Sequence, residues 1–155
     1  MKILMVCIGN ICRSPIAEGV MRHKIQQNNL DWEVDSAAVE SYHIGSPPHR
    51  HSQTVCKEHG IDISAQKARL FTASDLKTFD KIYVMANDVL VRVKEICGSS
   101  FDENKVVLFL EEQFPGERRS VTDPWYGDLD GYYPVYELIN ETCDQIIAKY
   151  QNSSV

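Results

Sequence analysis

The sequence of 155 residues has no apolar run that approaches the length of a membrane span, and its N-terminus lacks the pattern of a signal peptide. Its formal net charge of −6 argues against nucleic acid or an anionic membrane as a main partner, because both carry negative charge. Internal repeats and low-complexity segments are absent as well. We therefore expect a cytoplasmic protein, with no nucleic-acid or membrane partner and a single domain over residues 1–155.

The five cysteines lack the even number and the regular spacing of a disulfide framework, so we expect reduced thiols. Only Cys7 and Cys12 approach the spacing of a zinc-binding pair, and a loop motif explains them better. His43, His49 and His51 fall in a loop and an early helix turn without matching acidic residues. We expect neither a bound metal nor any other cofactor.

A strand, a tight loop and the start of a helix are predicted within the first 25 residues. Residues 3–6 form an apolar run that is typical of a buried strand. Apolar residues recur at helical spacing after Pro15, which suits the first position of a helix. Cys7 then ends the strand and Arg13 closes the loop. The segment between the two elements is Val6-Cys7-Ile8-Gly9-Asn10-Ile11-Cys12-Arg13-Ser14-Pro15.

This loop has the features of a phosphate-binding site. Successive backbone N–H groups can converge on an anion, and the helix N-terminus adds partial positive charge. Gly9 and Asn10 tolerate a positive φ, and the planar guanidinium of Arg13 can bind two phosphate oxygens. The same positive field favours the thiolate form of Cys7, to which Ser14 can donate a hydrogen bond. The candidate phosphate-binding residues are Ile8, Gly9, Asn10, Ile11, Cys12, Arg13 and Ser14.

The rest of the chain predicts an α/β fold. Further strands are expected at residues 32–38, 79–86 and 105–110, and helices at 50–59, 87–97 and 134–150. Strands that alternate with helices imply a parallel sheet with helices on both faces. Ligands of such sheets bind beyond the carboxyl ends of the strands, where the loop after the first strand lies. The long segment 111–133 is rich in Gly, Pro and acids, and we expect it to be functional. Residues 152–155 are expected to fray.

The segment from Val6 to Pro15 resembles the phosphate loop of the low-molecular-weight protein tyrosine phosphatases. A second segment, Asp123-Pro124-Trp125-Tyr126-Gly127, resembles a signature near the C-terminus of that family, and the chain length matches. The resemblance spans nearly the whole chain. It implies a four-stranded parallel sheet with the strand order 2-1-3-4.

The resemblance also implies hydrolysis of phosphotyrosine and aryl phosphates through a cysteinyl-phosphate intermediate. Cys7 would attack phosphorus, while Arg13 and the loop amides stabilise the equatorial oxygens. Asp123 would give a proton to the leaving phenolate and then take one from water, whereas Asp128 and Asp130 have the pattern of solvated turn residues. The expected partners are tyrosine-phosphorylated proteins, with inorganic phosphate or other oxyanions as competitive ligands, and we expect a monomer.

Two further roles are expected in and around this loop. Tyr42, Trp125 and Tyr126 would line the substrate cleft, where a ring can stack on a substrate ring. Cys12 would be the redox partner of Cys7, because a second thiol in the same loop can form a reversible disulfide with an oxidised first one.

The chain departs from the resembled family at two positions. The family commonly has His at the position of Gln66, and it usually follows its Met with Asp where this chain has Ala86. In family structures that His and Asp lie near each other beside the phosphate loop. We interpret the two replacements as a coupled change, since losing one partner alone would leave a poorly paired group.

Two other functions remain to be weighed. An arsenate reductase can share the fold and the Cys-x5-Arg loop, but its further cysteines normally follow the third strand, and residues 84–93 contain none. A phosphotyrosine-binding module would keep Arg13 and lose Cys7 or Asp123, and this chain has all three. An assay of aryl phosphate hydrolysis beside arsenate reduction separates these functions.

Overall fold

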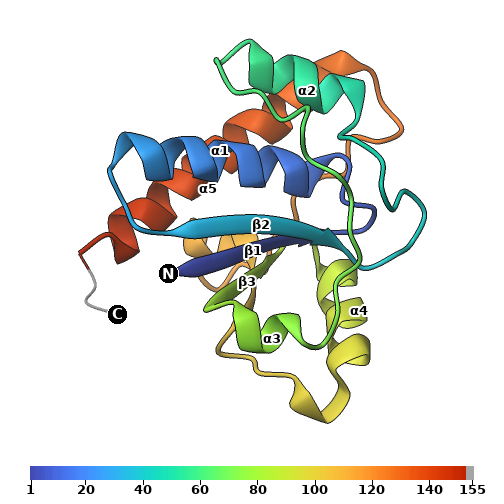
Figure 1. The fold of residues 1–155 in the computed structure, drawn as a ribbon, viewed down its shortest axis with the longest axis vertical. Helices are drawn as coiled ribbons and strands as arrows, with labels where there is room; N and C mark the ends of the chain where they lie inside the picture. The colour runs from blue at the N-terminus through green and yellow to red at the C-terminus, as the bar shows by residue number, and fades with distance from the viewer. Residues whose placement is uncertain (153–155) are drawn as a thin grey trace.

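The computed structural model describes residues 1–152 and contains a four-stranded parallel sheet (Figure 1). Its strand order is β2-β1-β3-β4, and all three pairings are parallel. The predicted fold class and strand order are therefore confirmed. The strands are β1 (Lys2–Cys7), β2 (Glu33–Ala38), β3 (Lys81–Val84) and β4 (Val106–Leu108).

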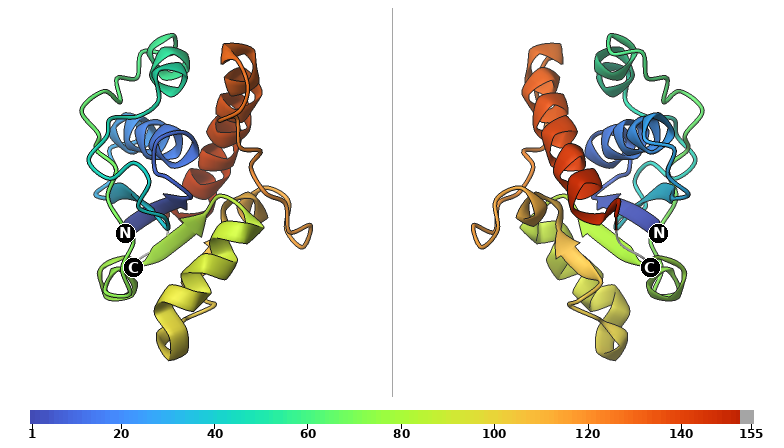
Figure 2. Two further views of the ribbon diagram at one scale, coloured as in Figure 1. Left: turned by 90° about the vertical axis from the view of Figure 1, so that its right-hand side faces the viewer. Right: turned by 90° about the vertical axis from the view of Figure 1, so that its left-hand side faces the viewer.

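Helices cover both faces of the sheet (Figures 1 and 2). On one face lie α1 (Arg13–Gln27) and α5 (Tyr132–Tyr150), with α2 (Arg50–Lys57) packed against both. On the other lie α3 (Asp75–Thr78) and α4 (Asn87–Cys97). Three short 3₁₀ helices complete the described elements: η1 (Gly98–Ser100), η2 (Phe109–Glu112) and η3 (Leu129–Gly131). Within residues 1–152, no helix has the length and apolar character needed to cross a membrane.

The central strand β1 supplies residues to two hydrophobic cores. Ile3 and Met5 belong to the cluster that contains the apolar residues of α1 and α5. Leu4 and Val6 belong to the cluster on the side of α3 and α4. This alternation is the two-residue period of a strand whose faces are both covered, so β1 is buried from Ile3 to Cys7 and its carboxyl end is held from both sides.

Both prolines that were expected to start helices lie two residues inside them. Helix α1 begins at Arg13 rather than Pro15, and α5 begins at Tyr132 rather than Pro134. The first N–H groups of a helix have no intrahelical acceptor, so a proline fits anywhere in the first turn. The predicted starts are wrong by two residues, and the correction brings Arg13 into the first turn of α1.

Other boundaries differ more locally. Strands β3 and β4 are both shorter than predicted. In β4 the reason is that the chain leaves the ladder for η2 at Phe109. Helix α2 ends at Lys57, and Ala86 rather than Asn87 is the N-cap residue of α4. The short helix α3 was not predicted, since four residues carry no readable period. Of the tail expected to fray, only residue 152 lies within the described part of the chain.

Helix α1 is in close contact with the segment that follows α2. A Cβ added at Gly19 would lie 2.4 Å from Cγ2 of Ile63 and 3.3 Å from Cγ2 of Ile61. These branched side chains are buried and have little room to move. The position therefore requires a residue without a side chain, even though it lies inside a helix.

We predict that Gly19→Ala lowers the free energy of unfolding by about 1–2 kcal/mol. The 2.4 Å contact places the overpacking cost in the upper part of the usual range, at about 2–3 kcal/mol, and the higher helix propensity of Ala offsets roughly 1 kcal/mol of it. Urea denaturation of the two proteins measures the difference. Gly131→Ala is the matched control, because no heavy atom lies within 4 Å of the added Cβ there. A Gly19→Ala protein as stable as the parent would contradict the packing argument.

Candidate active site

The loop after β1 leaves a row of backbone donors without protein partners. The carbonyl groups of Cys7, Ile8 and Ile11 accept hydrogen bonds from the N–H groups of residues 39, 40 and 49. Within the described residues 1–152, the N–H groups of residues 8–12 donate no hydrogen bond to the protein. The loop is thus held through its carbonyls, and its amides, followed by the N-terminus of α1, are available to an anion.

Gly9 and Asn10 meet different requirements in this loop. Asn10 is the residue with a positive φ, at 58°. A Cβ on Gly9 would lie 3.0 Å from Cδ2 of His43, so Gly9 allows the close approach of a neighbouring segment rather than a left-handed turn. Both features keep the loop tight between β1 and α1.

The side chain of Asn10 fixes its unusual backbone conformation. Its Nδ2 donates to Oγ of Ser14 at 2.8 Å and to Oγ of Ser36 at 2.9 Å, and its Oδ1 accepts from the N–H of Arg69 at 3.2 Å. Ser14 Oγ lies 3.0 Å from Sγ of Cys7. The hydrogen bonds of Asn10 therefore reach a hydroxyl group that contacts the candidate nucleophile.

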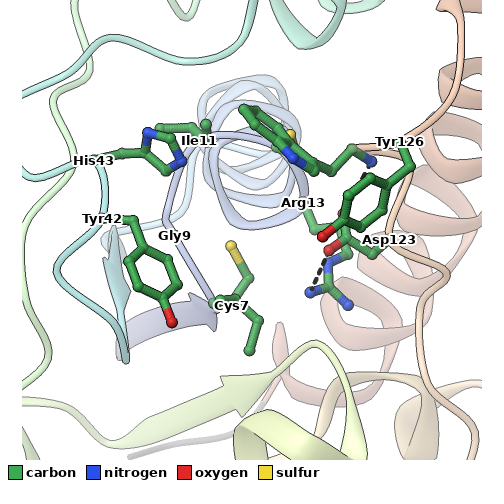
Figure 3. A pocket seen from close by; sticks show the side chains of 11 residues that line it. Cys7, Gly9, Ile11, Arg13, Tyr42, His43, Asp123 and Tyr126 are labelled. Carbon is green, nitrogen blue, oxygen red and sulfur yellow. Dashed lines mark hydrogen bonds and ion pairs between the residues drawn. The ribbon is translucent and has the colours of Figure 1, made fainter.

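Arg13 connects the phosphate loop to the segment that carries Asp123. Its buried guanidinium donates from Nη1 to the carbonyl of Val121 at 2.9 Å, and its Nη2 lies 3.6 Å from Oδ2 of Asp123 (Figure 3). The N–H of Val121 donates to the carbonyl of Met85 at the end of β3, at 2.7 Å. The guanidinium is thus aimed by a second strand of the sheet as well as by α1.

The backbone after Asp123 turns so that the carboxyl group stays over the pocket. Its Oδ1 accepts from the N–H of Trp125 at 3.0 Å, and the N–H of Gly127 donates to the carbonyl of Pro124 at 3.0 Å. The Asp123 side chain is 41% exposed, so solvent reaches it. Asp128 and Asp130 are also exposed, but they do not line the pocket.

One pocket brings most of the predicted site residues together, whereas Asn10 and Ser14 are not among the residues that line it (Figure 3). Cys7 and Arg13 line it with Asp123, and Tyr42 and Tyr126 stand on opposite sides of the Cys7 sulfur. Tyr42 is 73% exposed and Tyr126 93%, so the two rings form the rim rather than the floor. The remaining lining residues are Ile8, Gly9, Ile11, Cys12, His43 and Trp125.

Two histidines pack against Trp125 in a way that the sequence interpretation missed, and one of them, His43, lines the pocket. The ring centroids of His43 and Trp125 are 5.2 Å apart, and those of His49 and Trp125 are 5.5 Å apart. His49 also stacks on Tyr132, with a centroid distance of 5.5 Å. The ring of Trp125 therefore contacts both histidines. Within residues 1–152, no group of three His, Cys, Asp or Glu side chains could hold a metal.

Cys12 lies beside the pocket as a buried, free thiol. Its Sγ is 3.4 Å from the hydroxyl oxygen of Tyr132, and its carbonyl accepts a hydrogen bond from Ser52 Oγ at 3.2 Å. Burial raises the pKa of the Cys12 thiol to about 12. Cys12 is therefore protonated at neutral pH.

The two positions that depart from the resembled family have separate surroundings. Nε2 of Gln66 donates to the carbonyl of Pro15 at 3.1 Å, while its buried Oε1 has no hydrogen-bond partner within the described residues. Ala86 is buried in the hydrophobic cluster on the side of α4. Gln66 thus contacts the first turn of α1, and Ala86 fills apolar space at the other side of the sheet.

A thiol, an arginine and unpaired amides at a helix N-terminus are the groups expected of a site that holds an oxyanion next to a nucleophile. The family model of the low molecular weight phosphotyrosine protein phosphatases matches residues 2–154. The chain belongs to this family of phosphomonoester hydrolases, which confirms the resemblance and the assignment to this class of enzyme.

Individual relatives agree with this assignment. The chain is 36% identical over 150 residues to the low molecular weight phosphotyrosine protein phosphatase of Gallus gallus, covering 96% of this chain and 94% of the relative. The solved structure of a protein tyrosine phosphatase from Entamoeba histolytica, with Hepes in its active site, has a TM-score of 0.90 and 32% identity, covering 100% of this chain and 99% of that one. A Drosophila arginine phosphatase has a TM-score of 0.90 and 31% identity over 100% of both chains.

The contacts of His49 predict an acid-dependent loss of stability. Burial lowers the pKa of His49 from its usual value of 6.5, and the nearby His51 and Arg50 act in the same direction. Nδ1 of His49 also accepts a hydrogen bond from the N–H of His51 at 3.0 Å, which the imidazolium cannot do. The unfolded chain therefore binds the proton more readily, and the folded state loses stability as the pH falls below about 6.5.

We predict that His49→Asn removes this component. Asn can accept the same hydrogen bond at the start of α2 and does not titrate. Between about pH 7.5 and about pH 5, the melting temperature of the parent should fall further than that of the variant. Melting curves of both proteins at several pH values measure this. Parallel curves would show that protonation of His49 does not oppose folding.

Proposed function

We propose that the protein hydrolyses aryl phosphate monoesters, including phosphotyrosine in proteins, through a cysteinyl-phosphate intermediate and with Asp123 as the general acid. The observation that carries the proposal is the single pocket that Cys7, Arg13 and Asp123 line, next to the unpaired amides of residues 8–12. The family membership of the chain supports it.

In the first step the Cys7 thiolate attacks phosphorus and a P–S bond forms as the bond to the phenol oxygen breaks. The amides of residues 8–12 and the guanidinium of Arg13 bind the equatorial oxygens, whose geometry matches a planar donor fork. Ser14 Oγ, at 3.0 Å from Sγ, donates to the sulfur as the thiolate and again as the leaving group of the second step.

Asp123 handles the proton in both steps. It protonates the phenolate as that group leaves, and it then takes a proton from the water that attacks the phosphocysteine. The hydrogen bond from the Trp125 N–H to its Oδ1 leaves Oδ2 as the oxygen that faces Arg13 and the pocket. No metal ion is required, since the charges come from Arg13 and the loop.

The walls of the pocket favour an aromatic substrate. Tyr42 and Tyr126 flank the entrance, and the ring of Trp125 packs against those of His43 and His49. A phosphorylated tyrosine ring that enters between such rings gains apolar and edge-to-face contacts. Inorganic phosphate and other oxyanions should compete for the loop amides. Because a Drosophila relative is named an arginine phosphatase, phosphoarginine is the second substrate to assay.

Arsenate reduction fits this chain less well. Cys97 is buried at the C-terminal end of α4, an 11-residue helix that spans about 16 Å at 1.5 Å per residue. A thiol at that end of the helix cannot exchange with Cys7 without unfolding α4.

Cys12, which lines the same pocket as Cys7, is a better candidate than Cys97 for a disulfide with oxidised Cys7. Peroxide converts the Cys7 thiolate to a sulfenic acid, and the Cys12 thiol then displaces water to form the disulfide. The raised pKa of Cys12 keeps it protonated, so Cys7 is the thiol that oxidises first.

The substitution Cys7→Ser tests the covalent step. It should abolish turnover of phosphotyrosine while leaving inorganic phosphate binding within a few-fold of the parent, because the loop amides and Arg13 remain. Steady-state hydrolysis and isothermal titration with phosphate give the two quantities. Arg13→Lys is the matched comparison, and it should lose both, since a point charge cannot replace the guanidinium fork. Appreciable turnover by Cys7→Ser would exclude the cysteinyl-phosphate mechanism.

The substitution Asp123→Ala tests the general acid. General acid catalysis is worth about 10²–10⁴-fold, so the rate with phosphotyrosine should fall by an amount in that range. An activated aryl phosphate should be affected less, because its phenolate leaves without a proton. The alkaline limb of the pH–rate profile should also disappear. Asp128→Ala is the control and should change either rate by only a few-fold. If Asp123→Ala and the parent share the same leaving-group dependence, another group supplies the proton.

A further inference from the structure

Glu18 is a buried carboxylate of α1 that the proposed reaction does not use. Its side chain is 6% exposed, and both of its oxygens are hydrogen-bonded. Oε1 accepts from the hydroxyl of Ser36 at 2.6 Å, and Oε2 accepts from Nη1 of Arg22 at 2.6 Å. Arg22 in turn donates from Nη2 to the carbonyl of Val34 at 2.8 Å. The carboxylate is thus fixed between α1 and β2, the strand beside β1 (Figure 1).

The bond to Glu18 decides where the Ser36 proton lies. A serine hydroxyl has one proton, and a carboxylate can only accept a hydrogen bond. The Ser36 proton is therefore committed to Glu18, and the oxygen of Ser36 is left as an acceptor. Nδ2 of Asn10, at 2.9 Å, supplies the matching donor.

The amide of Asn10 is oriented from its other end as well. Its Oδ1 receives the N–H of Arg69 at 3.2 Å, so a flipped amide would face one donor with another and would lose the Ser36 bond. With this orientation Nδ2 also donates to Ser14 at 2.8 Å. The Ser14 oxygen is then the acceptor in that contact, and its own proton is free to point at Cys7 Sγ, 3.0 Å away.

We propose that Glu18 is a positioning residue for Cys7. Its carboxylate sets the direction of the hydrogen bonds that run through Ser36, Asn10 and Ser14, so that the last hydroxyl donates to the Cys7 sulfur and favours the thiolate. The effect on the state of Cys7 does not depend on the proposed function, whereas its consequence for turnover rests on it.

The charge of Glu18 acts through space in the opposite direction. A negative carboxylate disfavours a second negative charge nearby, although the contact with Arg22 compensates it. Loss of the carboxylate would then favour the Cys7 thiolate if charge alone mattered, and would disfavour it if the direction of the hydrogen bonds matters. The two mechanisms therefore predict shifts of opposite sign, which makes the test decisive.

The test follows the rate of alkylation of Cys7 by iodoacetamide as a function of pH, with the Cys7 peptide quantified by mass spectrometry. A neutral reagent is used because its approach does not depend on the charge of the loop. In Glu18→Gln the amide oxygen should face Arg22, because a guanidinium can only donate, so the amide nitrogen faces Ser36 as a competing donor and the ordered hydrogen bonds are broken. We expect the midpoint pH of alkylation to rise by about one unit, the size expected for a hydrogen bond to a charged group.

A double-mutant cycle with Ser36→Ala separates the hydrogen-bonded route from other effects. Ser36→Ala alone should raise the midpoint, and Glu18→Gln should add no further rise in the Ser36→Ala background. A further rise in that background would mean that Glu18 acts by a route that does not pass through Ser36, and a downward shift in either background would mean that its charge acts through space; either result would overturn the proposal. Glu33→Gln is the matched control, because Glu33 is an exposed carboxylate on β2, the strand that carries Ser36. The alkylation midpoint of this variant should equal that of the parent.

Thermal unfolding of each variant separates positioning from stability. A lower melting temperature with an unchanged midpoint would show a merely structural role and would overturn the proposal. If Glu18→Gln does not fold, the Ser36→Ala variant alone tests the proposal. An unchanged alkylation midpoint in that variant would show that the hydrogen bonds through Ser36 do not affect Cys7 and would overturn the proposal. If the parent fails to hydrolyse aryl phosphates, the proposed function is wrong, while the alkylation midpoints still test Glu18.

Discussion

The site depends on one constraint, the burial of β1 between two parallel neighbours. Cys7 pairs with Ala38 of β2, and Val6 pairs with Val84 of β3, so three strands end at one edge of the sheet. The phosphate loop after β1 and the segment with Tyr42 after β2 line the pocket, and the carbonyl of Met85 after β3 holds the N–H of Val121 in the segment that leads to Asp123. A parallel sheet thereby collects residues that are distant in sequence.

Two side chains convert this proximity into defined geometry. Asn10 ties the phosphate loop to β2 through Ser36 and to the segment before α3 through the N–H of Arg69. Arg13 ties the same loop to the segment of Asp123 through the carbonyl of Val121. Both are buried polar groups whose hydrogen bonds would be costly to leave unmade. The same contacts that place the candidate catalytic groups therefore also hold the loop in its native form.

Much of the fold and the candidate site could be predicted because the signals are local. Cys7, Gly9, Asn10 and Arg13 lie in one short loop, and the apolar periods on either side of it identify a strand and a helix. The roles of His43 and His49 could not be predicted, because they depend on contacts with Trp125, more than 70 residues away. The helix starts were missed for a different reason, because a proline indicates the first turn of a helix and not its first residue.

Glu18 illustrates why a buried network is harder to predict than a motif. In the sequence it is one acid in a helix, and its spacing from Arg22 suggests an ordinary surface pair. Only the folded chain places Ser36 of β2 against Glu18. The Glu18–Arg22 pair then fixes the direction of the hydrogen bonds that continue through Ser36. Gln66 and Ala86, the two positions that depart from the resembled family, take no part in this arrangement. The orientation of Asn10 and Ser14 comes from Ser36, Glu18 and Arg69, so neither replacement removes a hydrogen bond on which the Cys7 contact depends.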